Sequence, residues 1–248
     1  MIPKIIHYCW FGGKPLPKSA KKCIESWKKF LPDYEIKEWN ESNFNINIIP
    51  YTSEAYRVAK YAFVSDYARF WILYKYGGIY FDTDVEVLRN MNDIIIRGPF
   101  MAREDRGEKY PEVATGLVVA CEPRDKVILE IIKRYNLSKF VNDKNDRNIV
   151  NVVEIVSSLF INKGLTKNNK VQKISNFFIY PREYFCPMDS RTGIVKMTKN
   201  TYAIHWYAGS WLNKGHKLNK KIKKIIGPRF TNFVIRIKAR ILNMNSSN

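Results

Sequence analysis

The chain has 248 residues, of which 46% are hydrophobic, 14% aromatic and 26% charged. A chain of this length and composition can bury a large core, so disorder as the main state is excluded. Its apolar runs are far shorter than the ~20 residues that a membrane-spanning helix needs, and no signal-peptide pattern opens the sequence. The four scattered cysteines form no Cys-x-x-Cys pair, which argues against a zinc knuckle or a disulfide framework. We therefore expect a cytoplasmic protein.

The excess positive charge is concentrated at the end of the chain. Of the formal net charge of +19, residues 190–248 supply 13 through Lys and Arg without any Asp or Glu, which leaves +6 for the rest. Residues 217–226 and 230–242 mix cations with apolar residues at helical spacing, a pattern typical of a helix on a membrane surface. We expect a basic amphipathic tail at 214–248 that binds the anionic inner face of a membrane; the alternative is that its apolar stripe packs on the protein itself. Without a nucleic-acid-binding motif, nucleic acid is not the expected partner.

The hydrophobic pattern predicts strands that alternate with helices. The strongest helix is 53–76, because Ser53 can cap its start and Gly77-Gly78 can end it. Such alternation indicates an α/β domain with a mixed, mainly parallel sheet flanked by helices, which we place at 1–213. In chain order we expect strand 5–10, helix 18–31, strand 34–39, helix 53–76, strands 79–87, 101–102 and 117–120, helices 124–135 and 150–162, and strands 171–180 and 202–206.

Two aspartates one residue apart follow the double glycine. Asp82 and Asp84 stand at the exit of an apolar strand, where ligands usually bind in α/β sheets. Two like charges held so close are costly without a cation between them, so a hard divalent metal is the simplest resolution. The alternative is an ordinary turn after a strand. An aspartyl-phosphate phosphatase is disfavoured, because it expects Thr or Val where this chain has Glu86.

A charged pair precedes these aspartates on the expected helix. Asp66 and Arg69 are three residues apart, so they share one helical face. Surface ion pairs of this kind are worth little in free energy. On a helix otherwise so apolar, the pair indicates a binding feature.

Four segments resemble the glycosyltransferases with a DXD-type sugar-binding region: 2–13, 65–84, Gly116-Leu117 and 203–211. That family includes the yeast initiating mannosyltransferase, bacterial capsular and lipopolysaccharide sugar transferases and, more distantly, the clostridial glucosylating toxins. The combined spacing of Ser-Asp-x-x-Arg, Tyr-Gly-Gly and Asp-x-Asp is specific. The resemblance implies a GT-A fold, a nucleotide-sugar donor with UDP favoured, a divalent metal, usually manganese with magnesium as the alternative, and retention of anomeric configuration.

The resemblance also implies roles for individual residues. Asp82 and Asp84 match the DXD and are the expected catalytic residues, the second as a direct metal ligand and the first acting on the sugar, the ribose or through water. His205 matches a late metal ligand that is a carboxylate in the toxins. The other donor-binding candidates are Trp10, which would stack on the nucleobase, Phe11, Gly12, Asp66 and Arg69, which would contact ribose and sugar, Thr115, Gly116, and Ser210 and Trp211, which would close over the diphosphate.

Physical chemistry agrees with these roles. A bound dication stabilises the charge that gathers on a nucleoside diphosphate as the glycosidic bond breaks. Mixed carboxylate and imidazole ligands favour manganese over calcium or magnesium. The structural alternatives are that Trp10, Trp206 and Trp211 are core aromatics and that His205 is a structural histidine.

We therefore expect a metal-dependent retaining hexosyltransferase of bacterial capsule or lipopolysaccharide synthesis, which acts on a surface polysaccharide or a lipid-linked oligosaccharide. The alternatives are a metal-dependent phosphohydrolase, a binding protein that keeps the nucleotide-sugar pocket without catalysis, and a basic surface-adhering protein. Spacing singles out no further carboxylate as a nucleophile or base.

Overall fold

The computed structural model describes residues 1–105, 110–138, 140 and 151–208. The expected basic tail at 214–248 lies outside the described residues. The chain divides into a larger unit, Met1–Pro187 with Lys196–Trp206, and a smaller one, Met188–Val195 with the residues from Tyr207 onward. In the smaller unit, Met188 and Val195 form an isolated antiparallel bridge. Within the described residues, no helix is long and apolar enough to cross a membrane.

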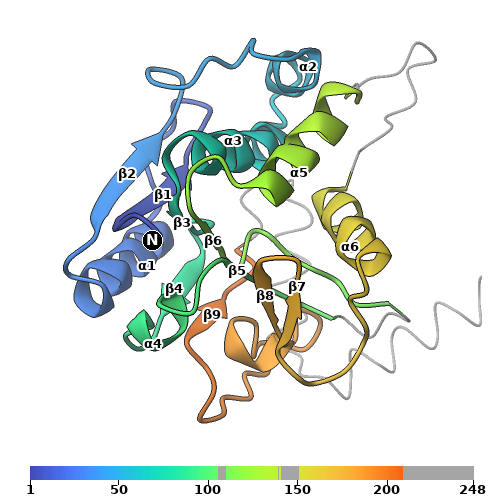
Figure 1. Cartoon of the computed structure of the whole chain (residues 1–248). Coiled ribbons are helices and arrows are strands. Elements are labelled where there is room, and N and C mark those ends of the chain that lie inside the picture. Colours follow the sequence, from blue (N-terminus) through green and yellow to red (C-terminus); the bar gives the residue numbers. More distant parts are fainter. Residues whose placement is uncertain (106–109, 139, 141–150, 209–248) are drawn as a thin grey trace, which may run out of the picture. The chain divides into compact units, whose positions relative to one another are not determined.

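The larger unit is built on a seven-stranded sheet with the strand order β2-β1-β3-β6-β5-β8-β7 (Figure 1). β1 pairs in parallel with β2 and β3, and β5 with β8, whereas β6 is antiparallel to β3 and β5, and β7 to β8. Five of the seven strands thus run in one direction, which confirms the expected mixed, mainly parallel sheet. The strands are β1 Ile5–Cys9, β2 Glu35–Trp39, β3 Gly78–Tyr80, β5 Phe100–Ala102, β6 Val119–Cys121, β7 Gln172–Ile174 and β8 Phe177–Tyr180.

Helices flank this sheet, as expected. Figure 1 shows α3 and α5 side by side, and their buried residues share one core with those of α2 and α6. Neighbouring residues of β1 face opposite ways, since Cys9 belongs to this core while Tyr8 packs edge-on against Trp27 of α1. The helices are α1 Lys18–Phe30, α2 Pro50–Arg57, α3 Tyr61–Tyr76, α5 Lys126–Asn136 and α6 Val152–Asn162.

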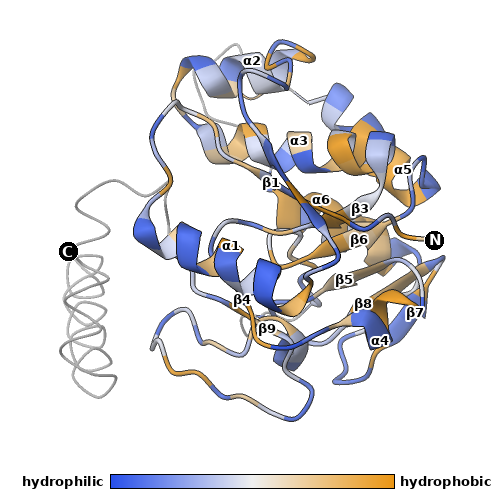
Figure 2. Ribbon diagram, turned by 90° about the vertical axis from the view of Figure 1, so that its left-hand side faces the viewer, coloured by the Kyte–Doolittle hydropathy of each residue, from blue (hydrophilic) through white to orange (hydrophobic). Residues whose placement is uncertain are grey.

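The helix α1 is amphipathic and anchors a strand that matters for the site. Its buried face consists of Ala20, Cys23, Ile24 and Trp27, and its hydrophilic positions appear blue in Figure 2. The indole Nε1 of Trp27 donates a hydrogen bond to the carbonyl of Val85 at 2.8 Å. Val85 begins β4 (Val85–Val87), so α1 fixes the segment that directly follows the two aspartates.

The expected helix at 53–76 is two helices. α2 begins at Pro50, which suits the first turn of a helix, and Ser53 bonds to the carbonyl of Pro50 rather than capping. Ala59 has a φ of 55°, and the amide of Lys60 bonds to the carbonyl of Ala55, which ends α2. The prediction of one helix was wrong because the apolar pattern runs through the break without a glycine or proline.

The expected strand at 79–87 is also interrupted, because β3 and β4 belong to different sheets. The amide of Val85 bonds to the carbonyl of Asp82 at 3.0 Å, which closes a turn over the Asp-Thr-Asp sequence. β4 then pairs antiparallel with β9 (Ala203–His205) in a separate two-stranded sheet. The turn therefore redirects the chain so that Val85 lies opposite His205.

Three smaller features differ from the expected pattern. The expected strand at 171–180 is a hairpin, β7 and β8, whose turn includes Ser175 with a φ of 54°. A four-residue helix, α4 (Asn92–Ile95), and a 3-10 helix at Arg182–Tyr184 were not expected. Such short elements carry too few residues to show a hydrophobic period.

Candidate active site

The parallel strands bring the predicted residues to one edge of the sheet. β1 and β3 run side by side in the same direction with His7 opposite Tyr80, so Trp10 and Asp82 leave the sheet at the same edge. The antiparallel β6 enters from that edge at Val119, shortly after Gly116. In open α/β sheets, the carboxyl ends of the strands are where ligands bind.

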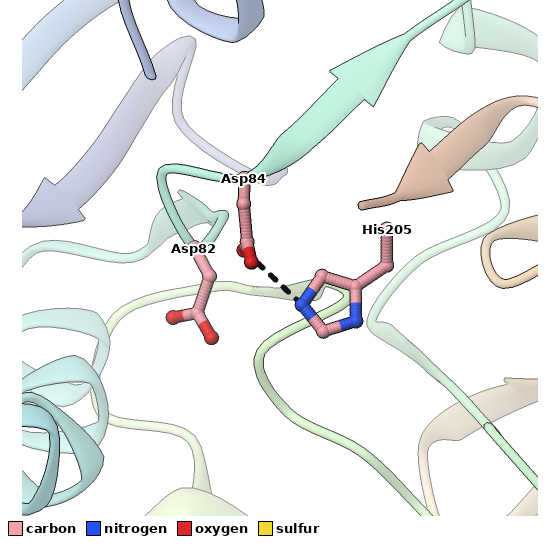
Figure 3. Close-up of side chains that lie close together, drawn as sticks. All are labelled: Asp82, Asp84 and His205. Atoms are coloured by element: carbon pink, nitrogen blue, oxygen red, sulfur yellow. Dashed lines mark ion pairs between the residues drawn. The ribbon is translucent and has the colours of Figure 1, made fainter. Parts of the chain in front are cut away.

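Asp82, Asp84 and His205 form one cluster of metal-ligating atoms. One ligand atom of each lies within 4.8 Å of the others, and Figure 3 shows Asp84 and His205 pointing toward one another with Asp82 beside them. Nε2 of His205 is 3.1 Å from Oδ1 of Asp84. The pairing of β4 with β9 and a bond from the amide of Trp206 to the carbonyl of Asp84 at 2.9 Å join the two segments. Two carboxylates and an imidazole are a donor set that suits a divalent metal ion.

Arg69 lies at the centre of a buried polar network beside this cluster. Its side chain is 4% exposed, and its Nη2 is 2.7 Å from Oδ1 of Asp66 and 3.3 Å from Oδ1 of Asp82. Nη1 donates to Oγ1 of Thr115 at 3.0 Å, and Nε donates to the carbonyl of Ser65 at 3.2 Å. The structure thus brings four predicted site residues, from α3, the DXD turn and the segment before β6, into one network.

Tyr80 belongs to this network and was missed in the sequence. Its hydroxyl donates to Oδ1 of Asp82 at 3.0 Å, and the guanidinium of Arg69 lies over its ring at 4.8 Å from the centroid. In the sequence Tyr80 looks like one more apolar residue of a buried strand. The available signal was its place two residues before Asp82, on the same face of an extended chain.

Burial and neighbouring charges shift the ionisation of this site. Burial raises the pKa of Asp66 to about 6, although Arg69 opposes the shift, and it raises the pKa of Asp82, which Asp84 increases further. Burial lowers the pKa of His205, but the carboxylates of Asp84, Asp82 and Glu104 outweigh it and raise that pKa. The carboxylates at this edge therefore repel one another, and a bound dication would relieve that repulsion.

Gly116 makes room for the Asp82 carboxylate. Its carbonyl accepts a hydrogen bond from the amide of Asp82 at 3.0 Å. A Cβ atom on Gly116 would lie 2.2 Å from Oδ2 of Asp82, closer than any real contact. The position therefore requires glycine for space.

We expect Gly116→Ala to disable the site and also to lower the stability of the fold. The added methyl would push the Asp82 carboxylate out of its bonds with Tyr80 and Arg69. Misplacing a reacting group by about 1 Å can lower the rate on the order of 10²-fold. Steady-state kinetics and a thermal melt of the same preparation would check this, and wild-type turnover would contradict it.

The segment after β1 is held by residues outside the cluster. The Nε1 of Trp10, a partly exposed residue, donates to the carbonyl of Lys14 at 2.5 Å. Phe11 is 6% exposed and packs edge-on against Phe44 in the core, which removes its ring from the surface that a donor could reach. Gly12 has a φ of 98°, and its amide bonds to Glu41 at 2.5 Å. Ser210 and Trp211 lie outside the described residues.

Comparisons with known proteins agree with this geometry. Residues 17–101 match the family described as the glycosyltransferase sugar-binding region containing a DXD motif. An uncharacterized glycosyltransferase of Acanthamoeba polyphaga mimivirus is 27% identical over 222 residues, which are 85% of this chain and 84% of that protein. Inositol phosphoceramide mannosyltransferase 3 of Schizosaccharomyces pombe is 33% identical over 105 residues, 38% of this chain and 27% of that protein.

Among solved structures, the PaToxG glycosyltransferase has a TM-score of 0.49 and 18% identity, covering 66% of this chain and 70% of that one. The family match includes Asp66, Arg69 and both aspartates of the DXD. The matched segment carries the motif, so the chain is similar to the glycosyltransferases with a DXD-containing sugar-binding region, as it is to relatives named as a glycosyltransferase and a mannosyltransferase.

Proposed function

We propose that the enzyme transfers a hexose from a nucleotide sugar, a UDP-sugar first, to a surface polysaccharide or a lipid-linked glycan with retention of configuration. The observation that supports this most is the convergence of Asp82, Asp84 and His205 beside the buried Arg69. A sugar donor that ends in a diphosphate needs positive charge at its leaving group, and this donor set suits a dication that supplies it.

The residues divide the work by their surroundings. Asp84 and His205 would hold the ion, with manganese favoured over magnesium because one ligand is an imidazole. Arg69 and Tyr80 both contact Oδ1 of Asp82 and so orient its carboxylate. Its other oxygen, Oδ2, would face the ion or the donor. When bound, the ion stabilises the charge that develops on the nucleoside diphosphate.

The fission yeast relative bears on the sugar and the acceptor. Its name describes mannosyl transfer to inositol phosphoceramide, which is a lipid. The alignment spans 105 residues, 38% of this chain. We therefore include a mannose nucleotide among the donors and a lipid-linked acceptor among the substrates that the enzyme is proposed to use.

A panel of nucleotide sugars with Mn²⁺ tests the proposal. A ligand that binds only the folded state at about 100 times its Kd adds about 2.7 kcal/mol to the free energy of unfolding. For a chain of this size, we expect the melting temperature to rise by roughly 5–10 °C with the true donor. EDTA should abolish the shift.

Product analysis then separates the alternatives. A transferase releases free sugar or a glycoside together with the nucleoside diphosphate, whereas a phosphohydrolase releases inorganic phosphate. A pure binding protein would show the thermal shift without turnover. If no nucleotide sugar shifts the melt, the proposed function is wrong.

We also propose that the basic tail, residues 214–248, attaches the enzyme to the anionic inner face of a membrane, where lipid-linked acceptors would be met. Each cation near such a surface contributes about 1 kcal/mol of attraction. A chain ending at residue 213 should cosediment with phosphatidylglycerol vesicles less than the full chain does. Equal sedimentation of the two would exclude this role.

A further inference from the structure

Glu104 is a buried carboxylate that the proposed function does not use. Only 5% of the residue is exposed. It follows β5, and its amide donates to the carbonyl of Glu112 at 2.9 Å. The neighbouring residue, Arg103, forms an isolated antiparallel β-bridge with Val113. Residues 103–104 and 112–113 thus form the two legs of a hairpin beyond β5.

The returning leg of this hairpin leads straight into the active site. The amide of Ala114 bonds to the carbonyl of Ala102. The next residue, Thr115, accepts a bond from Arg69, and Gly116 accepts a bond from the amide of Asp82 and leaves space for its carboxylate. Glu104 is therefore fixed, through the hairpin, to the same segment that positions Asp82. A side chain on such a framework keeps its place relative to the reacting groups.

The side chain of Glu104 is on the same face of the extended chain as Phe100. The ring of Phe100 packs against Phe185, which packs against Tyr202 just before β9 and His205. The neighbour of Glu104, Arg103, lies on the opposite side of the strand, where its guanidinium bonds to the carbonyl of Thr166 at 3.3 Å. The negative charge of Glu104 acts on His205, as one of the three carboxylates that raise its pKa. Glu104 is not a member of the group of ligand atoms formed by Asp82, Asp84 and His205 in the described residues.

The order of strands places Glu104 on the far side of the cluster from Trp10. Along the edge lie Trp10 after β1, Asp82 after β3, Gly116 before β6 and Glu104 after β5. If the nucleobase of the donor lies over the end of β1 and its diphosphate lies at the DXD turn, the end of β5 remains for the acceptor. Glu104 is the buried carboxylate at the end of that strand.

We propose that Glu104 is the acceptor-side carboxylate of this enzyme, an inference that rests on the proposed function. It accepts the hydrogen bond of the attacking hydroxyl and takes its proton as the bond from that oxygen to the anomeric carbon forms. At the same time the bond from the anomeric carbon to the diphosphate breaks, and the nucleoside diphosphate leaves with the electron pair.

Retention fits this placement. A hydroxyl that attacks from the face of the leaving diphosphate approaches beside the groups that hold the diphosphate. Glu104 follows β5 at the same edge of the sheet as those groups. In the absence of an acceptor, water takes the place of the hydroxyl, so hydrolysis of the donor depends on the same carboxylate.

Three variants of the full chain test this role: Glu104→Gln, Glu104→Asp and Glu112→Gln. Glu112→Gln is the matched control, because Glu112 lies opposite Glu104 in the same hairpin and the substitution removes the same charge. The measurements are kcat and KM for hydrolysis of the nucleotide sugar selected in the panel, and the affinity for UDP with Mn²⁺ by calorimetry. Loss of a general base lowers kcat on the order of 10²–10⁴-fold.

We expect Glu104→Gln to show that loss in kcat, with KM and UDP affinity within about threefold of wild type. Glu104→Asp should recover part of the rate, and Glu112→Gln should behave as wild type. The inference is overturned if kcat of Glu104→Gln stays near wild type, if UDP binding falls in step with the rate, or if this isosteric variant loses its cooperative melt. A wild-type enzyme without turnover on any nucleotide sugar would instead reject the proposed function.

Discussion

Replacing Asp84 by alanine should abolish sugar transfer while the chain still folds. The Asp84 carboxylate is 3.1 Å from His205. The backbone bond that joins this segment to β9 runs from the amide of Trp206 to the carbonyl of Asp84, so it survives the change of side chain. Removing it leaves two of the three side chains of the cluster, and the affinity for a dication should fall steeply. We expect a loss of activity on the order of 10³-fold or more, as for removal of a major electrostatic stabiliser.

The folded state should tolerate this substitution because Asp84 repels its neighbour. Burial raises the pKa of Asp82, and the negative charge of Asp84 raises it further, so removing the Asp84 carboxylate relieves a repulsion. Without metal, the melting temperature should stay near that of wild type, because the relieved repulsion with Asp82 offsets the lost ion pair with His205. The shift that Mn²⁺ gives to wild type should disappear. Asp33→Ala, which removes an exposed carboxylate paired with Lys4, is the control. An Asp84→Ala enzyme that still transfers sugar would refute the metal role.

The sequence allowed the prediction of those features that rest on local pattern. The strands β1 and β2 and the helices α1, α5 and α6 have distinct hydrophobic periods, and their bounds agree with the structure to within a few residues. The spacing of Asp66, Arg69 and the DXD indicated one candidate site, and the structure brings these residues into contact, because the two residues of an i, i+3 pair share one helical face.

What could not be predicted depends on contacts between distant segments. The turn after Asp82 carries no glycine or proline, so the chain looked like one strand through residue 87, and only the pairing of β4 with β9 shows where it bends. Glu104 has no motif around it, and its carboxylate becomes notable only when the hairpin beyond β5 places it at the same edge of the sheet as the DXD turn. The burial of Phe11, a position of the motif, was likewise not evident from the sequence.

Replacing Arg69 by methionine should cost both stability and activity. The guanidinium is the cation that faces Asp66 and Asp82, and it also bonds to Thr115 and to the carbonyl of Ser65. Removing one partner of a buried ionic network costs about 3–5 kcal/mol of the free energy of unfolding, because charges are left buried without compensation. Arg69→Lys should keep a charge but not the fork that serves Asp66 and Asp82 together, so we expect an intermediate loss.

The loss in the free energy of unfolding caused by Arg69→Met should depend on pH, because Asp66 titrates. In the wild-type fold the pKa of Asp66 is already raised to about 6, chiefly by burial, and Arg69 opposes the shift. Without Arg69 this pKa rises further, so the folded state binds a proton more tightly than the unfolded state does. Stability is then retained at low pH and lost as the pH rises from the unfolded pKa of about 3.9 through the folded one.

Chemical denaturation at about pH 5 and about pH 8 would measure this difference, with the larger loss expected at the higher pH. The double variant Arg69→Met with Asp66→Asn removes the buried charge as well, and should regain part of the stability lost at the higher pH. Its activity should stay low, because Asp82 still lacks the guanidinium that orients it. A loss of stability that is equal at both pH values and unchanged in the double variant would mean that Arg69 acts through packing alone.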